Sequence, residues 1–435
     1  MATGLPYTDF RCLPLDLRQT LAPMATADHT RPDSRGVFTQ RDFRTLWLAQ
    51  FVSVFGDFLA LFGVVSLITF RWHGTATQVT YLLIAYMLPL AVVSPISGVF
   101  VDRWRAKQVM IFSDLIRGAL VLLLLWVTGL AQLCAIFIAL SVVSSFFAPA
   151  QSVVLRTLVT KEKLLAANAL MSQAFYAVRL LSPVVAGALV AWLTEKSCFY
   201  FDAFSFFFSA VMIGSLVIKR DAAPSSNTVS GFLEQLTSGN RFIFTHPALA
   251  FVITSMVSAM FVMSCLSPLF SIYVRDILHS GVFMYGVVSS AVGVGLIVGT
   301  ATVNHFGRDR SKKSIVLSGL VTCAAGVALL GIFPAVSAAV ATTFTMGFGI
   351  SFVVVAAQTL MQQETPPSML GRVSSSFMSV FSLAQVFGLL LSGHLAVWFG
   401  IRAVFLMCAA ALTLIVTAGL VQHKAKEISA DANAD

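Results

Sequence analysis

The sequence predicts an all-α membrane protein whose twelve transmembrane helices form two pseudo-symmetric six-helix bundles. Three observations carry this prediction: a series of long apolar blocks, a composition of 57% hydrophobic and only 11% charged residues, and an uneven distribution of Lys and Arg between successive connections. A chain with so little charge lacks the polar surface that a water-soluble protein of this length needs.

The apolar blocks follow one another along almost the whole chain. They cover residues 46–70, 78–101, 109–130, 134–155, 164–193, 198–218, 249–274, 282–304, 314–333, 336–360, 373–398 and 402–421. A helix of about 20 to 30 residues crosses a hydrocarbon core of ~30 Å with some tilt. Because lipid offers no hydrogen bonds to the backbone, blocks of this length predict helices, whereas barrel strands are only about 10 residues long.

The basic residues indicate the orientation of these helices. Of the 28 Lys and Arg residues, 22 lie in the N-terminal segment and in every second connection, four lie in the remaining connections, and two lie inside helices. Basic loops stay on the cytoplasmic side. We therefore expect a multi-pass protein of the cell (inner) membrane with both termini in the cytoplasm. Contact with anionic lipid accounts for the net charge of +9, and no nucleic-acid partner is expected.

Polar segments divide the chain into five parts. These are a disordered cytoplasmic N-terminus (1–40), a first six-helix bundle (41–218), a cytoplasmic linker (219–246), a second six-helix bundle (247–421) and a cytoplasmic tail (422–435). Within the linker, residues 230–244 fit either an amphipathic helix lying along the inner membrane surface or a plain connection with one helical turn.

The two halves are predicted to be a parallel repeat. An offset of 206 residues places Gly187 over Gly393, Trp192 over Trp398, and Ser182 over Gly388; the same offset places Arg179 over Gln385. Both halves have the same number of spans in the same orientation. Two such halves around a site near the middle of the membrane are a common transporter design.

A signature lies between the second and third blocks, where residues 98–107 read GVFVDRWRAK. It resembles the cytoplasmic signature of the major facilitator superfamily, although Ala106 stands where that family usually has a basic residue. Residues 43–57 and 199–211 resemble the drug and siderophore exporter branch that includes macrolide efflux proteins. The resemblance implies the major facilitator fold and an export function.

The resemblance also implies a gate at this signature. Gly98 would let the second and eleventh helices approach closely, and Asp102 would bind the start of the eleventh helix near Arg372 when the cytoplasmic side closes. Arg103 and Lys107 complete the motif. The alternative is that the basic residues of this loop only set the topology.

Two ionisable residues are expected at mid-depth in the membrane, where charges are costly and usually functional. Asp57 lies about 15 Å into the first helix at 1.5 Å per residue, and Arg179 lies near the middle of the fifth. We expect them to pair across a central cavity and to bind substrate or a coupled proton. Gln385, which the repeat places at the equivalent of Arg179, is a third candidate. The alternative is a static ion pair between helices.

Three further charges fall within predicted helices. Asp114 and Arg117 are three residues apart on one helix face, which favours a local ion pair over substrate contact. Asp202 follows the start of the sixth helix by a few residues, and we expect it to cap or lock an outer gate.

The fifth helix contains a predicted bend. Ser182, Pro183 and Gly187 resemble the superfamily's antiporter motif, with Ser182 and Ala186 in place of two of its glycines. Small side chains and a missing N–H donor favour a closely packed bend.

Nothing in the sequence predicts an enzyme. It contains no phosphate-binding GxxxxGK[ST] loop, no His, Cys and carboxylate cluster with metal spacing, and no Gly-x-Ser-x-Gly elbow, so no cofactor or metal is expected. We expect a monomeric carrier that exports a small amphiphilic or hydrophobic compound in exchange for protons. The alternatives are a uniporter, a lysophospholipid or siderophore transporter, or a transport-inactive membrane sensor or scaffold.

Overall fold

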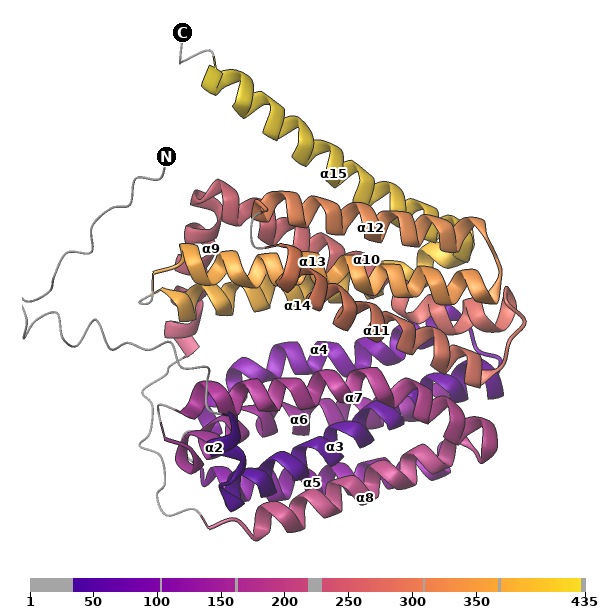
Figure 1. Cartoon of the computed structure of the whole chain (residues 1–435). Coiled ribbons are helices and arrows are strands. Elements are labelled where there is room, and N and C mark those ends of the chain that lie inside the picture. Colours follow the sequence, from indigo (N-terminus) through magenta and orange to yellow (C-terminus); the bar gives the residue numbers. More distant parts are fainter. Residues whose placement is uncertain are drawn as a thin grey trace, which may run out of the picture.

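The computed structural model of the chain describes residues 34–101, 104–160, 163–217, 229–307, 310–366 and 369–431. The elements of this part are all helical, and two bundles of six long helices lie one above the other in Figure 1. The first bundle consists of α3 (Arg41–Ser66) with its extension η2 (Leu67–Arg71), α4 (Ala76–Val101), α5 (Ala106–Leu123) with η3 (Leu124–Trp126), α6 (Leu130–Leu158), α7 (Leu164–Trp192) and α8 (Glu195–Gly214). The second consists of α10 (Pro247–Asp276), α11 (Val282–Phe306), α12 (Lys312–Ile332), α13 (Val336–Glu364), α14 (Leu370–Phe399) and α15 (Ile401–Asp431).

The predicted fold class and its twelve apolar spans are confirmed. Within the described residues, twelve helices are long and apolar enough to cross a membrane. Their ends follow local chemistry: Pro247 opens α10 in the first turn, where its missing N–H costs nothing, and α14 ends at Gly400 in a left-handed conformation with φ 80°. The helix ends lie within about five residues of the apolar blocks, except that α15 continues well past residue 421 to Asp431.

Each bundle buries its own apolar core. In the first bundle, α3 packs on α7 and α8, α5 on α6 and α8, and α4 on α6; in the second, α13 packs on α11 and α12, α10 on α14, and α12 on α15. Large apolar side chains also remain exposed along the helices, for example Val211 and Trp126. An apolar outer surface of this kind is compatible with lipid, whereas it would be unfavourable in water.

The bundles meet through two equivalent helix pairs, α7 with α11 and α14 with α4. A Cβ atom on Gly187 would lie 3.2 Å from the Cα of Gly286, and one on Gly393 would lie 2.9 Å from the Cα of Thr77. Small residues allow helix backbones this close an approach. Gly187 and Gly393 are the two positions that the 206-residue offset superimposes, and both lie at contacts between the bundles.

The recorded contacts between the bundles gather at one end. We call the end at which α3 begins the terminal face, which is on the left in Figure 1, and the other end the opposite face. At the opposite face, the Arg275 side chain donates to the carbonyl oxygens of Thr69 and Gly74, and the Thr69 hydroxyl donates to Ser271 at 3.0 Å. At the terminal face, a Cβ atom on Gly98 would have no neighbour within 4 Å.

Two short helices change the predicted segment boundaries. Residues 34–38 form α2 (Ser34–Phe38), in which Val37 is fully buried, so the expectation of disorder up to residue 40 is wrong for this stretch. In the linker, α9 (Val229–Thr245) is a continuous helix that packs mainly on α14, and a Cβ atom on its Gly239 would lie 2.4 Å from the Arg372 carbonyl oxygen. The linker is therefore more than a connection with one helical turn.

Candidate functional site

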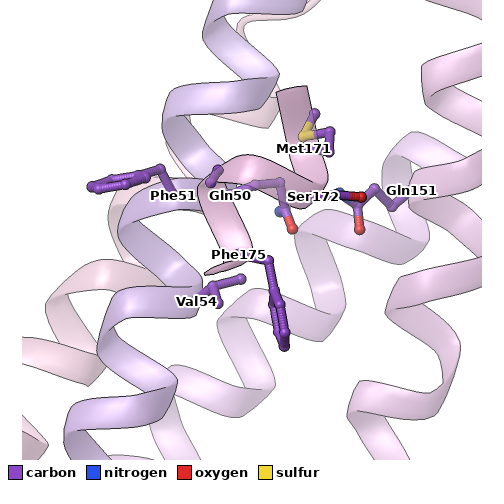
Figure 2. Close-up of a pocket in the computed structure, with 8 residues that line it drawn as sticks. Gln50, Phe51, Val54, Gln151, Met171, Ser172 and Phe175 are labelled. Atoms are coloured by element: carbon purple, nitrogen blue, oxygen red, sulfur yellow. The ribbon is translucent and has the colours of Figure 1, made fainter. Parts of the chain in front are cut away.

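A cavity of about 240 Å³ lies between α3, α6 and α7 in the first bundle (Figure 2). It is lined by Gln50, Phe51, Val54, Gln151, Met171, Ser172, Ala174 and Phe175. Gln50, Gln151 and Ser172 have uncharged side chains that can donate and accept hydrogen bonds, and the other side chains are apolar. Such a lining suits a compound that has both polar and apolar parts.

Helical register extends this lining toward the middle of the membrane. On α3, Gln50, Val54 and Asp57 follow the i, i+4, i+7 spacing, and on α7, Ser172 and Arg179 are seven residues apart with Phe175 between them. Residues at these spacings share one helix face. The Asp57 side chain is 34% exposed, and Arg179 is exposed although it lies at the middle of its helix.

Asp57 and Arg179 do not form the predicted ion pair. In the described part of the chain, the partner of Asp57 is Arg117 on α5, whose Nη1 lies 3.9 Å from the Asp57 Oδ2 atom. The expectation failed because α3 packs on α8 as well as on α7, and Arg117 of α5, which also packs on α8, reaches the Asp57 carboxylate. The same Arg117 guanidinium also donates to the Asp114 carboxylate.

Arg117 is held in an almost fully buried position, with 5% of its side chain exposed. Its guanidinium carbon lies 4.4 Å from the ring centroid of Phe147 and 4.3 Å from that of Phe206. Stacking on aromatic faces and pairing with Asp114 together offset the cost of removing this charge from water. Arg117 is therefore packed and ion-paired within the first bundle, although its Nε atom and the Asp114 Oδ2 atom have no hydrogen-bond partner among the described residues.

Asp202 belongs to the same buried region. It is 1% exposed, and a Cβ atom on Gly56 would lie 2.5 Å from its Oδ1 atom. It interacts electrostatically with Asp57 and Arg117, and the Ser205 hydroxyl donates to its Oδ1 atom at 3.3 Å. This corrects the expected outer gate: α8 packs on α3, α5 and α7, all of the first bundle, so Asp202 lies inside that bundle and away from the boundary with the second.

Three carboxyl groups thus share one guanidinium inside the first bundle. We call Asp57, Asp114, Arg117 and Asp202 the acidic cluster. Asp57 is its most accessible carboxyl group, since Asp114 and Asp202 are buried. The structure places Asp57 where the cluster and the face of the cavity-lining helix α3 meet.

The predicted bend lies at the boundary between the bundles. Ser182 is fully buried, Pro183 is inside α7, and Gly187 contacts Gly286 of α11. Pro183 has no N–H group, so the Arg179 carbonyl four residues earlier loses its usual helical donor. The missing backbone hydrogen bond and the close contact between α7 and α11 therefore both lie near the exposed Arg179 side chain.

Parts of the predicted gate motif lie outside the described residues, namely Asp102 and Arg103. Lys107 donates to the carbonyl oxygens of Gly214 and Leu216 at 2.7 and 2.8 Å, so it caps the end of α8 within its own bundle. The Arg372 side chain is exposed at the start of α14.

Gln385 lies half-buried near the middle of α14, as the repeat predicted, and remains a candidate. Among the described residues, no group of three or more His, Cys, Asp or Glu side chains is arranged to hold a metal ion.

Sequence reasoning missed the cavity itself and the partner of Asp57. The signal for the cavity is present in the spacing: Gln50 lies seven residues before Asp57, and Ser172 lies seven before Arg179, each pair on one helix face. Polar residues recurring at helical spacing in an apolar span indicate an inward-facing stripe. The position of Gln151 has no comparable signal in the sequence.

Two apolar six-helix bundles of transmembrane length, with a cavity between their helices, are the architecture of a multi-spanning membrane transporter. Residues 46–388 and 253–433 match the family model of the Major Facilitator Superfamily, and the chain belongs to this superfamily. The family predicted from the loop signature is confirmed.

The relatives include exporters. The chain is 28% identical over 404 residues to the MFS-type transporter YfiS of Bacillus subtilis, covering 89% of this chain and 94% of YfiS. It is 24% identical over 395 residues to macrolide efflux protein A of Streptococcus pyogenes, covering 89% and 96% of the two chains. Among solved structures, the nucleoside transporter NupG has a similar fold, with a TM-score of 0.70 at 12% identity over 88% of this chain and 99% of NupG.

Proposed function

We propose that the protein exports a small amphiphilic or hydrophobic compound across the cell (inner) membrane in exchange for protons, as a monomer with both termini in the cytoplasm. The similarity to macrolide efflux protein A supports export. The lining of the cavity, which combines amide and hydroxyl groups with apolar side chains, supports an amphiphilic cargo.

The position of Asp57 carries the proposal for proton coupling. If all three carboxyl groups of the acidic cluster were ionised, Arg117 would leave a net charge of −2 in apolar surroundings, which is unfavourable. The cluster therefore favours bound protons. Asp57 is its accessible member, so it is the group that exchanges a proton with the cavity.

Alternating access follows from the contacts between the bundles. The recorded contacts join the bundles at the opposite face, and the cavity lies in the half of the helices nearer the terminal face. Cargo would therefore enter from the terminal, cytoplasmic side. Release requires the opposite face to separate while the terminal face closes, with the Gly98–Asp102 segment approaching the start of α14 as the gate.

The proposal is tested in proteoliposomes with an imposed proton gradient. A neutral, a cationic and an anionic dye (N-phenyl-1-naphthylamine, ethidium and 8-anilinonaphthalene-1-sulfonate) serve as cargo. The gradient should drive accumulation of at least one dye by the unmodified protein. Asp57→Asn should abolish gradient-driven accumulation of the dye, because the variant can no longer bind and release a proton at this position. Exchange of dye for dye without a gradient should continue.

Asp42→Asn is the matched control, since it removes a carboxyl group from the first turn of the same helix, far from the cavity. It should leave gradient-driven transport unchanged. Unchanged gradient-driven transport by Asp57→Asn would show that the coupled proton binds elsewhere.

A further inference from the structure

We propose that the cargo carries an anionic group, a carboxylate, phosphate or sulfonate, which binds to Arg179. Gln50 supplies a neighbouring donor, and the apolar part of the cargo lies against Phe51 and Phe175. This inference rests on the proposed function only in taking the cavity between α3, α6 and α7 as the cargo site.

Arg179 is a cation near the middle of a membrane-spanning helix, and no salt bridge joins it to an anion among the described residues. It lies 15 residues into α7, or about 22 Å at 1.5 Å per residue, and it is the one Lys, Arg, Asp or Glu residue of that helix. Its electrostatic neighbour is Tyr176, which carries a phenol and not a carboxylate. A charge at such depth normally faces a partner or a water-filled cavity, and it marks a substrate path.

No carboxylate in the described part of the spans is placed to neutralise Arg179. In the first bundle, Asp57 and Asp114 pair with Arg117. Asp202 is buried and interacts with the same guanidinium, and Glu195 pairs with Arg71. In the second bundle, the acidic residues of the described spans are Asp276 and Glu364, which end α10 and α13. The position equivalent to Arg179 by the repeat is the neutral Gln385. The anion must therefore come from outside the described protein.

Gln50 gives an independent indication of the same ligand chemistry. Its side chain is 93% buried, since only 7% of the residue is exposed, and it lines the cavity. Its Nε2 donor has no hydrogen-bond partner among the described residues. An unpaired buried donor costs free energy, so the site is completed by an acceptor atom of a ligand or of water.

The guanidinium of Arg179 and the Nε2 group of Gln50 are both hydrogen-bond donors. A guanidinium has five N–H donors arranged to bind two oxygens of one anion, and the Gln50 amide adds a donor in the cavity that continues along α7 toward Arg179. Ser172 shares the helix face of Arg179 and lines the same cavity as Phe175 (Figure 2). An anionic head group with an attached apolar body matches both parts of this surface.

Binding of two otherwise similar probes tests the inference. The protein is placed in lipid nanodiscs, and the dissociation constants of 11-(dansylamino)undecanoic acid and its methyl ester are measured by fluorescence at a pH at which the acid is ionised. Signals from empty nanodiscs are subtracted. The acid should bind about 10-fold more tightly than the ester, the difference expected for one charge-assisted hydrogen-bonded contact.

Variants separate the role of Arg179 from general effects of charge. Arg179→Gln should remove the preference for the acid, Arg179→Lys should retain most of it, and Gln50→Leu should weaken binding of the acid several-fold. Arg156→Gln removes an exposed cation from the last turn of α6 and should change nothing. The melting temperature of each variant identifies those that do not fold, and Gln50→Leu provides a test that leaves Arg179 intact.

Equal binding of acid and ester, or an acid preference that persists in Arg179→Gln, would overturn the inference. Failure of this inference differs from failure of the proposed function. An Arg179-dependent preference without gradient-driven export would support the anionic ligand and refute proton-coupled export. Gradient-driven export without any preference for the acid would support proton-coupled export and refute the anionic ligand.

Discussion

Arg275 on α10 donates a hydrogen bond to the carbonyl oxygen of Gly74, 2.9 Å away and 201 residues earlier in the chain. The bond crosses from the second bundle to the loop after η2 in the first. The same guanidinium donates to the Thr69 carbonyl oxygen, so one side chain joins two backbone positions. Because these bonds exist only while the opposite face is closed, they stabilise that state over any state in which the face has separated.

Replacing Arg275 should therefore shift the conformational equilibrium. Arg275→Gln loses charge-assisted bonds worth about 1.5 to 3 kcal/mol, which is roughly a 10- to 100-fold change in the ratio of the two states. Distances between spin labels at Leu193 and His279, in a cysteine-free background, should lengthen at the opposite face.

Arg402→Gln is the matched control for this measurement. Arg402 also donates to backbone carbonyl groups, those of Gly331 and Ile332, but all three residues belong to the second bundle. Its replacement should leave the distance between the bundles unchanged. An identical label distance in both variants would mean that the Arg275 bonds do not contribute to closure.

The close contact between Gly187 of α7 and Gly286 of α11 should not tolerate a larger side chain. A Cβ atom on Gly286 would lie 2.5 Å from the Pro183 carbonyl oxygen, so Gly286→Ala forces two backbones apart at a cost of about 1 to 3 kcal/mol. We expect a lower melting temperature in detergent and reduced dye transport. Gly281→Ala, at a position where a Cβ atom has open space, should change neither measurement.

The fold could be predicted closely from the sequence because lipid imposes few alternatives. A long block of apolar residues in a bilayer forms a helix, so the ends of the block predict the ends of the helix. The block 164–193, for example, corresponds to the helix α7 (Leu164–Trp192). The continuation of α15 was missed because residues beyond 421 are polar, and helix formation there does not depend on apolar content.

The site could be predicted only in part. Depth follows from counting residues, which identified Asp57 and Arg179 as charges in mid-membrane. Which charged side chains pair depends on how each helix is rotated about its axis and packed against its neighbours. The sequence of an apolar span does not define this rotation, because all faces of the helix are hydrophobic. The sequence therefore predicted the ion pair of Arg117 with Asp114, three residues apart on one helix, but did not identify Arg117 as the partner of Asp57 on another helix.

The buried ion pair of α5 should behave as a unit. Arg117→Gln leaves the Asp114 carboxyl group buried without its cation and should lower stability by about 3 to 5 kcal/mol. Asp114→Asn leaves a buried guanidinium and should cost a similar amount. The double variant should be destabilised by less than the sum, because the Asp114–Arg117 pair is then removed as a whole. Asp57 and Asp202 lose Arg117 in the single Arg117→Gln variant and in the double variant alike.

Unfolding of the four proteins in detergent, followed by intrinsic fluorescence, measures this coupling. Asp276→Asn, which removes an exposed carboxylate beside Arg275, provides the scale for a surface ion pair and should cost less than about 1 kcal/mol. Additive effects of the two α5 substitutions would show that Asp114 and Arg117 contribute independently.

Replacing Gly98 should block closure of the terminal face without destabilising the state in which that face is open. A Cβ atom there would have no neighbour within 4 Å, so Gly98→Leu should change stability by no more than about 0.5 kcal/mol. If α4 and α14 must approach one another when the terminal face closes, the added side chain prevents that approach, and dye transport should fall to background although the protein folds and binds dye normally. Gly214→Leu, at another glycine with open space around it, should transport normally, because α8 packs only within the first bundle. Full transport by Gly98→Leu would mean that this segment is not part of the gate, and that the basic residues around it serve topology alone.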